Sequence, residues 1–245
     1  MAITIAISGK GGSGKTTLAA MIIRLLLDQS AKAILAVDAD PNSCLGLTMG
    51  VEATGNIAEI REKARSKKPS NGGMDRLRSF EYDIQQAITE TDGFDLLTMG
   101  RPEGPDCYCA VNNLLRRFLD ELSSAYSFVV IDNEAGMEHL SRRTTNKVDL
   151  LCITAESTPL GVLTARRIFD LAKQLPISVK QIGIVWNKSE NIKELDGIET
   201  FGCISHDNAV FEASMQGKTI FDLEDSSPAL LAVRKILEHK LSLKV

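Results

Sequence analysis

A glycine-rich segment near the N-terminus carries the residues best suited to phosphate chemistry. It consists of Gly9, Lys10, Gly11, Gly12, Ser13, Gly14, Lys15, Thr16 and Thr17. The spacing matches G-x-x-x-x-G-K-[ST], in which glycines let backbone N–H groups turn toward an anion and a following helix adds its positive dipole end. Lys15 would contact the β- and γ-phosphates, and the Thr16 hydroxyl group would ligate magnesium. The segment therefore predicts binding of ATP with Mg²⁺ and its hydrolysis to ADP.

The same glycines allow a second interpretation. Gly9, Gly11 and Gly14 also satisfy G-x-G-x-x-G, the turn that binds the pyrophosphate group of dinucleotides. Asp38 ends the next predicted strand, where such proteins place an acid that binds ribose. A dinucleotide turn, however, requires neither a lysine nor a metal-binding hydroxyl group. The lysine and threonine that follow the last glycine therefore favour ATP.

Carboxylates follow two of the predicted buried strands. Asp132 ends the apolar run of residues 128–132. Asp38 and Asp40 lie where the run of residues 33–38 ends. Because ligands of open α/β sheets bind at the carboxyl ends of the strands, all three acids can face one nucleotide, with Asp132 and Asp38 in the magnesium shell. Each aspartate taken alone also suits a turn or a helix cap.

The elements that must position these residues are visible as apolar runs that alternate with helical patterns. Strands that are apolar throughout indicate burial on both faces, as in a parallel sheet covered by helices. The polar stretch of residues 61–73 is expected to be a surface excursion. We predict an α/β fold, a doubly wound and mostly parallel sheet flanked by helices, as a single P-loop domain over residues 1–245. The predicted strands are residues 3–8, 33–38, 94–99, 128–132, 150–154, 182–187 and 201–204, and the predicted helices include residues 16–27, 112–122, 161–175 and 229–241.

Composition and charge exclude several classes of protein. Hydrophobic residues make up 44% of the chain, enough for a sizeable core. No run approaches the roughly 20 apolar residues of a membrane span. The apolar residues 1–7 lack the basic region and cleavage site of a signal peptide and predict a strand. The formal net charge of -4 argues against general binding of nucleic acid, so we expect a cytoplasmic protein that binds neither nucleic acid nor membrane.

The chain has five cysteines, an odd number that indicates reduced thiols in the absence of a secretion signal. Cys44, Cys152 and Cys203 stand alone and are expected to be small buried hydrophobic residues. Cys107 and Cys109 flank one tyrosine, a spacing that puts them on nearly opposite sides of a regular helix. Chelation by both thiols therefore requires a loop or an irregular first turn.

One such pair supplies two sulfur ligands, fewer than the four of a tetrahedral or square-planar site. A two-fold dimer would bring two pairs together and complete the site. Four thiolates suit nickel(II), zinc or a shared iron–sulfur cluster. The alternative is a metal-free pair of cysteines that is packed or redox-active.

The second lysine of the segment, Lys10, makes it resemble the deviant Walker A motif. That motif marks a family that includes the Min-type and Par-type ATPases, the arsenite pump ATPase and the nitrogenase iron protein, and the resemblance covers nearly the whole chain. It implies a homodimer with ATP between the subunits. Lys15 would contact the phosphates of its own subunit's ATP, Lys10 would reach across to the phosphates of the partner's ATP, and Asp40 would position the attacking water. It also implies that Asn187 recognises adenine, with residues 204–208 as a second base-side loop that carries serine where proline is common.

Two further stretches resemble one branch of that family. Residues 104–116, which include Cys107 and Cys109, and residues 132–139 are similar to the accessory ATPases that insert nickel into carbon monoxide dehydrogenase, with close relatives that serve acetyl-CoA synthase. The resemblance implies nickel as cargo and one of those enzymes as client, whereas the chemistry of the thiolates leaves zinc open as well. Two other functions stay open. One is a Min- or Par-type positioning ATPase that binds membrane or DNA, and the other is an electron carrier whose dimer shares an iron–sulfur cluster.

Overall fold

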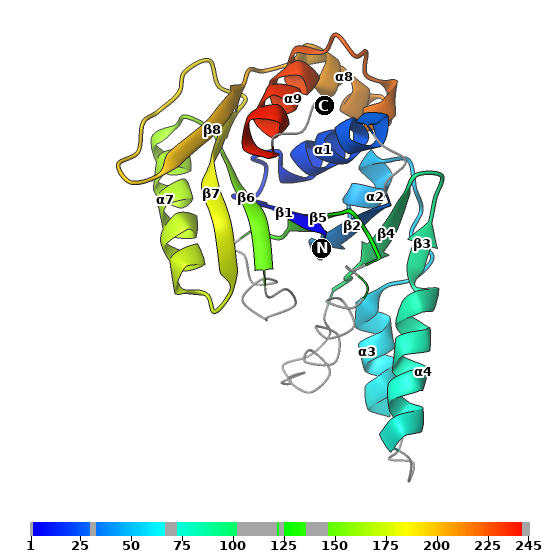
Figure 1. Ribbon diagram of the computed structural model, residues 1–245. Helices are drawn as coiled ribbons and strands as arrows, with labels where there is room; N and C mark the ends of the chain where they lie inside the picture. The colour runs from blue at the N-terminus through cyan, green and yellow to red at the C-terminus, as the bar shows by residue number, and fades with distance from the viewer. Residues whose placement is uncertain are drawn as a thin grey trace.

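The computed structural model describes residues 2–29, 33–66, 73–101, 122, 125–135 and 147–241. Within these residues, eight strands form one sheet in the order β3-β4-β2-β5-β1-β6-β7-β8 (Figure 1). All neighbouring strands run parallel except β3 and β4. The strands are β1 Ile3–Gly9, β2 Ile34–Ala39, β3 Ile88–Glu90, β4 Phe94–Thr98, β5 Phe128–Asn133, β6 Lys147–Ala155, β7 Ser178–Asn187 and β8 Glu199–Ile204. The mostly parallel α/β sheet is confirmed with all seven predicted strands, and the short antiparallel β3 is an addition.

Helices cover both faces of this sheet (Figure 1). The described helices are α1 Lys15–Gln29, α2 Leu45–Thr48, α3 Ile57–Ser66, α4 Gly73–Gln86, α7 Pro159–Gln174, α8 Asn208–Met215 and α9 Pro228–Leu241, with a 3-10 turn η1 at Ile220–Asp222. One hydrophobic core joins α1, α2, α8 and α9 to one face, and a second joins α3, α4 and α7 to the other. None of these described helices has the length and apolar character needed to cross a membrane. The predicted helix at 112–122 lies outside the described residues except for its last position.

The polar stretch expected as a surface excursion is helical over much of its length. Residues 61–66 complete α3 and residue 73 begins α4, and the two helices project from the sheet as a hairpin (Figure 1). The hairpin is anchored by Ile57, Ile60 and Ile84, which are buried in the second core. The sequence predicts the excursion but not its helices, because a helix with few apolar residues and a strongly charged exposed face gives a weak periodic signal.

α1 holds the glycine-rich segment against the sheet. Ile22 and Leu25 on this helix are each 1% exposed, and burial of such a side chain contributes about 1.5–3 kcal/mol. Arg24 is also buried, and its guanidinium group donates to the carbonyl oxygen of Ile220 and to Asp225 Oδ1, each at 2.7 Å. The helix is therefore fastened to the sheet by apolar contacts and to the η1 turn by polar ones.

We expect Arg24→Met to lower the free energy of unfolding by about 2 kcal/mol, because it leaves the buried carbonyl oxygen of Ile220 without its donor. Asp225→Asn is the matched control. The Asp225 side chain is 81% exposed, so loss of its charge should cost less than about 1 kcal/mol. Urea unfolding at pH 7 measures both values. Equal losses in the two variants would show that the buried contact does not carry the stabilisation.

Candidate functional site

The glycine-rich segment lies at the carboxyl end of β1, between β5 and β6. β1 ends at Gly9 and α1 begins at Lys15, so residues 10–14 connect the strand to the helix. Gly12 and Gly14 have φ values of 81° and 91°, in the left-handed region where a side chain would add strain. The strand–loop–helix context that the phosphate-binding motif requires is therefore present. We call residues 10–14 the phosphate loop.

Three carbonyl groups of the phosphate loop are bound from within the protein. The carbonyl oxygen of Lys10 accepts a hydrogen bond from the Ser13 N–H group at 3.1 Å. That of Gly12 accepts one from Lys188 Nζ at 2.9 Å, and that of Ser13 accepts one from Asn187 Nδ2 at 2.8 Å. A loop that surrounds an anion with N–H groups must direct its carbonyl groups elsewhere. These three hydrogen bonds hold the carbonyl groups in orientations that leave the inside of the loop free for an anion.

Asn187, expected to recognise adenine, has both ends of its amide engaged. Nδ2 donates to Ser13, and Oδ1 accepts from the Lys188 N–H group at 3.0 Å. A Cβ atom added to Gly14 would lie 2.2 Å from Nδ2, so only glycine fits beside this amide. Asn187 therefore braces the phosphate loop in this structure. It also lines the adjacent pocket, and its contact with adenine stays a prediction.

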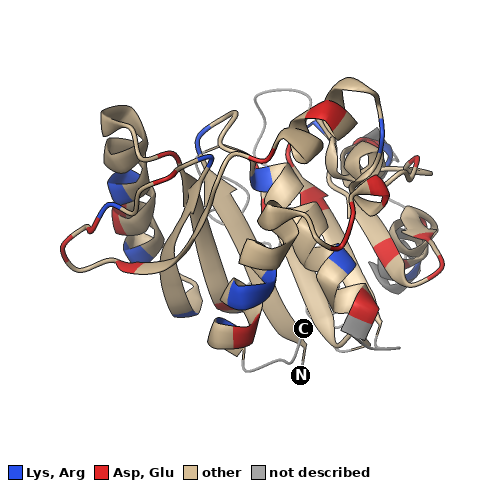
Figure 2. Cartoon of the chain, turned by 90° about the horizontal axis from the view of Figure 1, so that it is seen from above, with Lys and Arg blue, Asp and Glu red and all other residues tan. Residues whose placement is uncertain are grey.

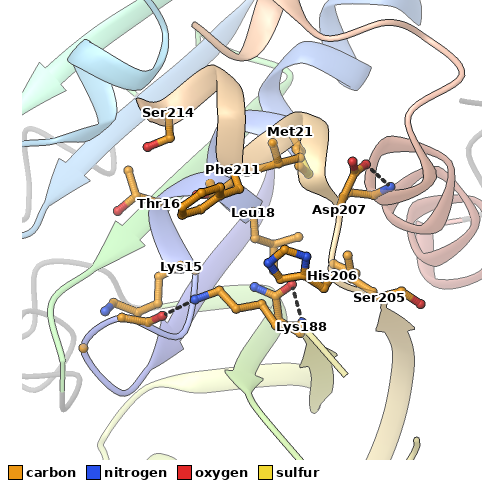
Figure 3. Close-up of a pocket in the computed structure, with 18 of the residues that line it drawn as sticks. Lys15, Thr16, Leu18, Met21, Lys188, Ser205, His206, Asp207, Phe211 and Ser214 are labelled. Atoms are coloured by element: carbon orange, nitrogen blue, oxygen red, sulfur yellow. Dashed lines mark hydrogen bonds between the residues drawn. The ribbon is translucent and has the colours of Figure 1, made fainter. Parts of the chain in front are cut away.

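A pocket of about 450 Å³ lies over the phosphate loop (Figure 3). One end is lined by the loop and the start of α1, including Lys15 and Thr16. The other end is lined by four residues of the expected base-side loop, 204–207, and by α8. There the rings of His206 and Phe211 lie 6.4 Å apart. The size and the two chemically different ends suit a nucleotide, with phosphates at the loop and a base beside the rings.

Asp207 secures the base end of this pocket. Its Oδ1 accepts from the Ala209 N–H group at 2.9 Å. Its Oδ2 accepts from Ser227 Oγ at 2.7 Å and from the Ala229 N–H group at 3.1 Å. Partial burial acts to raise the pKa of the carboxyl group, but these hydrogen bonds together lower the pKa below its usual value. One charged group therefore holds the starts of both α8 and α9.

Asp38 and Asp132 lie side by side at the carboxyl ends of β2 and β5. The parallel pairing sets Asp38 opposite Asp132, and Asp132 opposite Ile7 of β1. Asp132 Oδ2 accepts a hydrogen bond from Thr16 Oγ1 at 2.6 Å. Asp38 Oδ2 accepts one from the Leu45 N–H group at 2.9 Å. Asp132 thus lies on the strand next to β1, which carries the phosphate loop, and Asp38 lies one strand further away. Both are at the carboxyl ends of their strands, as the sequence predicts.

Burial disfavours charge on both carboxyl groups, which are 1% and 0% exposed. It raises the pKa of Asp38 to about 7, and the charge of Asp132 adds to the effect. Burial also raises the pKa of Asp132 to about 6, against the hydrogen bond from Thr16 and the charge of Lys15. Asp132 Oδ1 is buried without a hydrogen-bond partner. The two carboxylates, one of which has an unpartnered oxygen atom, and the Thr16 hydroxyl group form a set of oxygen donors that fits Mg²⁺.

The remaining residues of the predicted catalytic group lie around the phosphate loop. The buried Lys15 lines the pocket, and its Nζ is 3.5 Å from the carbonyl oxygen of Lys10. The exposed Lys10 borders a second pocket of about 220 Å³, between the loop and the start of α7. Asp40 lines the main pocket, and its Oδ1 accepts from the N–H group and from Nδ2 of Asn42 at 2.9 and 3.0 Å.

The cysteines divide into two groups. Cys107 and Cys109 lie outside the described residues, so their metal site stays a prediction. Within the described part of the chain, no three His, Cys, Asp or Glu side chains are grouped to hold a metal ion. Cys152 is buried as expected and Cys203 is half-buried. The expectation of burial was wrong for Cys44, which stands at the exposed N-terminal end of the short helix α2.

We expect the protein without nucleotide or magnesium to lose about 6 kcal/mol of stability as the pH rises from about 4 to about 7. Unfolding returns Asp38 and Asp132 to the ordinary pKa of 3.8, so the folded state binds more protons than the unfolded state in this interval. Urea titrations in EDTA at several pH values measure the slope. Asp38→Asn should reduce the dependence of stability on pH. An unchanged dependence in that variant would show that Asp38 is not its cause.

Comparison with known proteins identifies the family. Residues 4–220 match the family described as the CobQ/CobB/MinD/ParA nucleotide binding domain. The chain is 38% identical to an uncharacterized ATP-binding protein of Methanocaldococcus jannaschii, covering 98% of this chain and 99% of that protein. It is 32% identical to the carbon monoxide dehydrogenase accessory protein CooC of Rhodospirillum rubrum, covering 93% of this chain and 94% of that protein.

Solved structures with the same fold agree with this match. The septum site-determining protein MinD complexed with Mg-ADP, from Pyrococcus horikoshii OT3, is 21% identical with a TM-score of 0.69, covering 99% of this chain and 98% of that chain. The MinC:MinD cell division protein complex of Aquifex aeolicus is 18% identical with a TM-score of 0.72, covering 100% of this chain and 97% of that chain. At such identities the likeness shows the fold alone. With the family match and the site geometry, it follows that the chain belongs to the CobQ/CobB/MinD/ParA nucleotide-binding domain family and is a P-loop ATPase.

Proposed function

We propose that this ATPase is a homodimer that couples ATP binding and hydrolysis to holding and releasing nickel for a client enzyme, carbon monoxide dehydrogenase or acetyl-CoA synthase. Its main support is the pair Cys107 and Cys109 in a chain that is 32% identical to the carbon monoxide dehydrogenase accessory protein CooC. Two copies of the pair would supply four thiolates, the number that a soft-metal site requires. Zinc is the alternative cargo for the same ligands.

Hydrolysis would use the residues at the phosphate end of the pocket. Lys15, with Lys10 from the partner subunit, would offset the negative charge of the transferred phosphoryl group, because this reaction depends mostly on positioning and electrostatics. Thr16 and Asp132 would hold Mg²⁺ directly or through water, with Asp38 behind them. The ion supplies positive charge against the phosphate oxygens when bound. The unpartnered oxygen atom of Asp132 supports this assignment.

Asp40 would orient the attacking water. Its carboxylate lines the pocket beside the phosphate loop and is only partly buried, so water can reach it. The two hydrogen bonds from Asn42 fix its orientation through Oδ1. Its neighbour Asp38 is fully buried and engaged with the backbone at the start of α2, which suits a role in the magnesium shell better than one in contact with water.

We expect Asp40→Asn to lower kcat by about 100-fold or more, with the KM for ATP changed less than about threefold, because the amide is no base yet has the same size. Steady-state phosphate release measures both. With ATP bound, the slowly hydrolysing variant should elute at twice the mass of one chain in size-exclusion light scattering, and Lys10→Ala added to it should restore the single mass. A single mass for Asp40→Asn with saturating ATP would contradict the ATP-dependent dimer.

We expect the wild-type protein to retain about one nickel ion per two chains after anaerobic gel filtration with ATP, measured by plasma mass spectrometry. Cys107→Ala combined with Cys109→Ala should retain none and still hydrolyse ATP. Cys44→Ala is the matched control, since it removes an exposed thiol outside the pair. Equal retention by wild type and the double variant would rule out the pair as the site. A parallel zinc titration decides between the two cargoes.

A Min- or Par-type positioning ATPase is the second candidate, favoured by the likeness to MinD in fold. A membrane-binding C-terminal helix receives no support from α9, whose Leu230, Val233 and Leu237 are buried in the core. Basic and acidic residues are interspersed on the described elements (Figure 2), which suits a DNA surface poorly. ATP-dependent sedimentation with liposomes would favour this candidate.

The third candidate is the electron carrier with a shared iron–sulfur cluster. A visible absorption band after anaerobic purification would indicate it.

A further inference from the structure

Lys188 follows β7 and reaches across the phosphate loop (Figure 3). Its ammonium group donates to the carbonyl oxygen of Gly12 at 2.9 Å and lies 3.7 Å from Glu156 Oε1. Gly12 belongs to the loop after β1, and Glu156 follows β6 directly. Because β1, β6 and β7 are neighbours in the sheet, one ammonium group connects the ends of three adjacent strands.

The backbone of Lys188 is strained in a way that serves this contact. Its φ value is 52°, in the left-handed region that lysine seldom adopts. Consecutive side chains of a strand point to opposite faces of the sheet. The turn at Lys188 instead lets two consecutive side chains, Asn187 and Lys188, reach two consecutive carbonyl groups, those of Ser13 and Gly12. Backbone strain of this kind is retained where surrounding contacts enforce it, and it gathers at functional sites.

We propose that Lys188 is a positioning residue of the ATPase, which holds the Gly12 carbonyl group away from the nucleotide and so keeps the phosphate loop ready to bind it. A charged donor makes this hydrogen bond stronger than one from a neutral group, and the bond is short although water also reaches the exposed ammonium group. The Glu156 contact is long and joins side chains that are 46% and 42% exposed, so it contributes little. The role therefore rests on the bond to Gly12. It concerns ATP binding alone and is independent of the metal cargo.

Three substitutions of Lys188 distinguish the effect of its ammonium group from the effect of its strained backbone. Lys188→Met keeps the apolar stem and removes the donor, whereas Lys188→Arg keeps a charged donor. Lys188→Asn removes the donor but suits the left-handed backbone, so relief of backbone strain offsets part of the stability that is lost with the bond to Gly12. Glu156→Gln is the matched control, because it removes the charge partner and leaves the bond to Gly12 intact.

We expect Lys188→Met and Lys188→Asn to raise the KM for MgATP about tenfold and to weaken ADP binding by a similar factor, with kcat changed less than about threefold. Lys188→Arg should stay within about threefold of wild type, and Glu156→Gln within about twofold. Steady-state kinetics and calorimetric titration with ADP measure these values, and melting temperatures report on the fold.

The asparagine substitution decides between positioning and plain stability. A protein carrying Lys188→Asn that is fully folded at the assay temperature and still binds ATP and ADP weakly would support the positioning role. If both donor-free variants keep the wild-type KM and ADP affinity, whatever their melting temperatures, Lys188 only stabilises the fold and the proposal is overturned. If Lys188→Met fails to fold, Lys188→Asn alone gives the same decision.

Discussion

A peptide group cannot present its N–H group to an anion without turning its carbonyl group the other way. The phosphate loop meets this constraint with donors placed behind it. The Ser13 N–H group donates to the carbonyl group of Lys10 from inside the loop. From the end of β7, Lys188 donates to the carbonyl group of Gly12, and Asn187 donates to that of Ser13. The conformation of a few residues after β1 therefore depends on a strand two positions away in the sheet, and on the order that places it there.

The same order sets the opposite side of the site. β5 and β2 follow on the other flank of β1, and their parallel register brings Asp132 and Asp38 together. Burial disfavours charge on both carboxyl groups, and the charge of Asp132 further disfavours charge on Asp38, which is unfavourable for the isolated protein. The core of α1 and the sheet supplies the stability that allows such an arrangement to persist. The arrangement of the site suits a cation and phosphates, and it lowers the stability of the protein when neither is bound.

Much of this architecture could be predicted because the strongest signals are local. The strands of the central sheet are continuous apolar runs, and the phosphate loop is one unbroken motif. β3 is three residues long and gives no such run. Lys188 stands 176 residues from the Gly12 carbonyl group that it binds, and no periodicity links two positions that only the sheet brings together. The place of Phe211 in the pocket could not be predicted either. It is an exposed residue of α8, and only the fold brings it beside the phosphate loop.

The acids beside the phosphate loop and the acid at the base end of the pocket have pKa values displaced in opposite directions. At the ends of β2 and β5, burial raises the pKa of Asp38 to about 7 and that of Asp132 to about 6. At the base end the pKa of Asp207 is lowered, so its charge and its hold on α8 and α9 persist in acid. Mild acidification would therefore protonate Asp38 and Asp132 while Asp207 keeps its charge and its hydrogen bonds. Acid would then weaken the attraction of the two strand-end carboxyl groups for a divalent cation before it loosens the starts of α8 and α9 at the base end of the pocket.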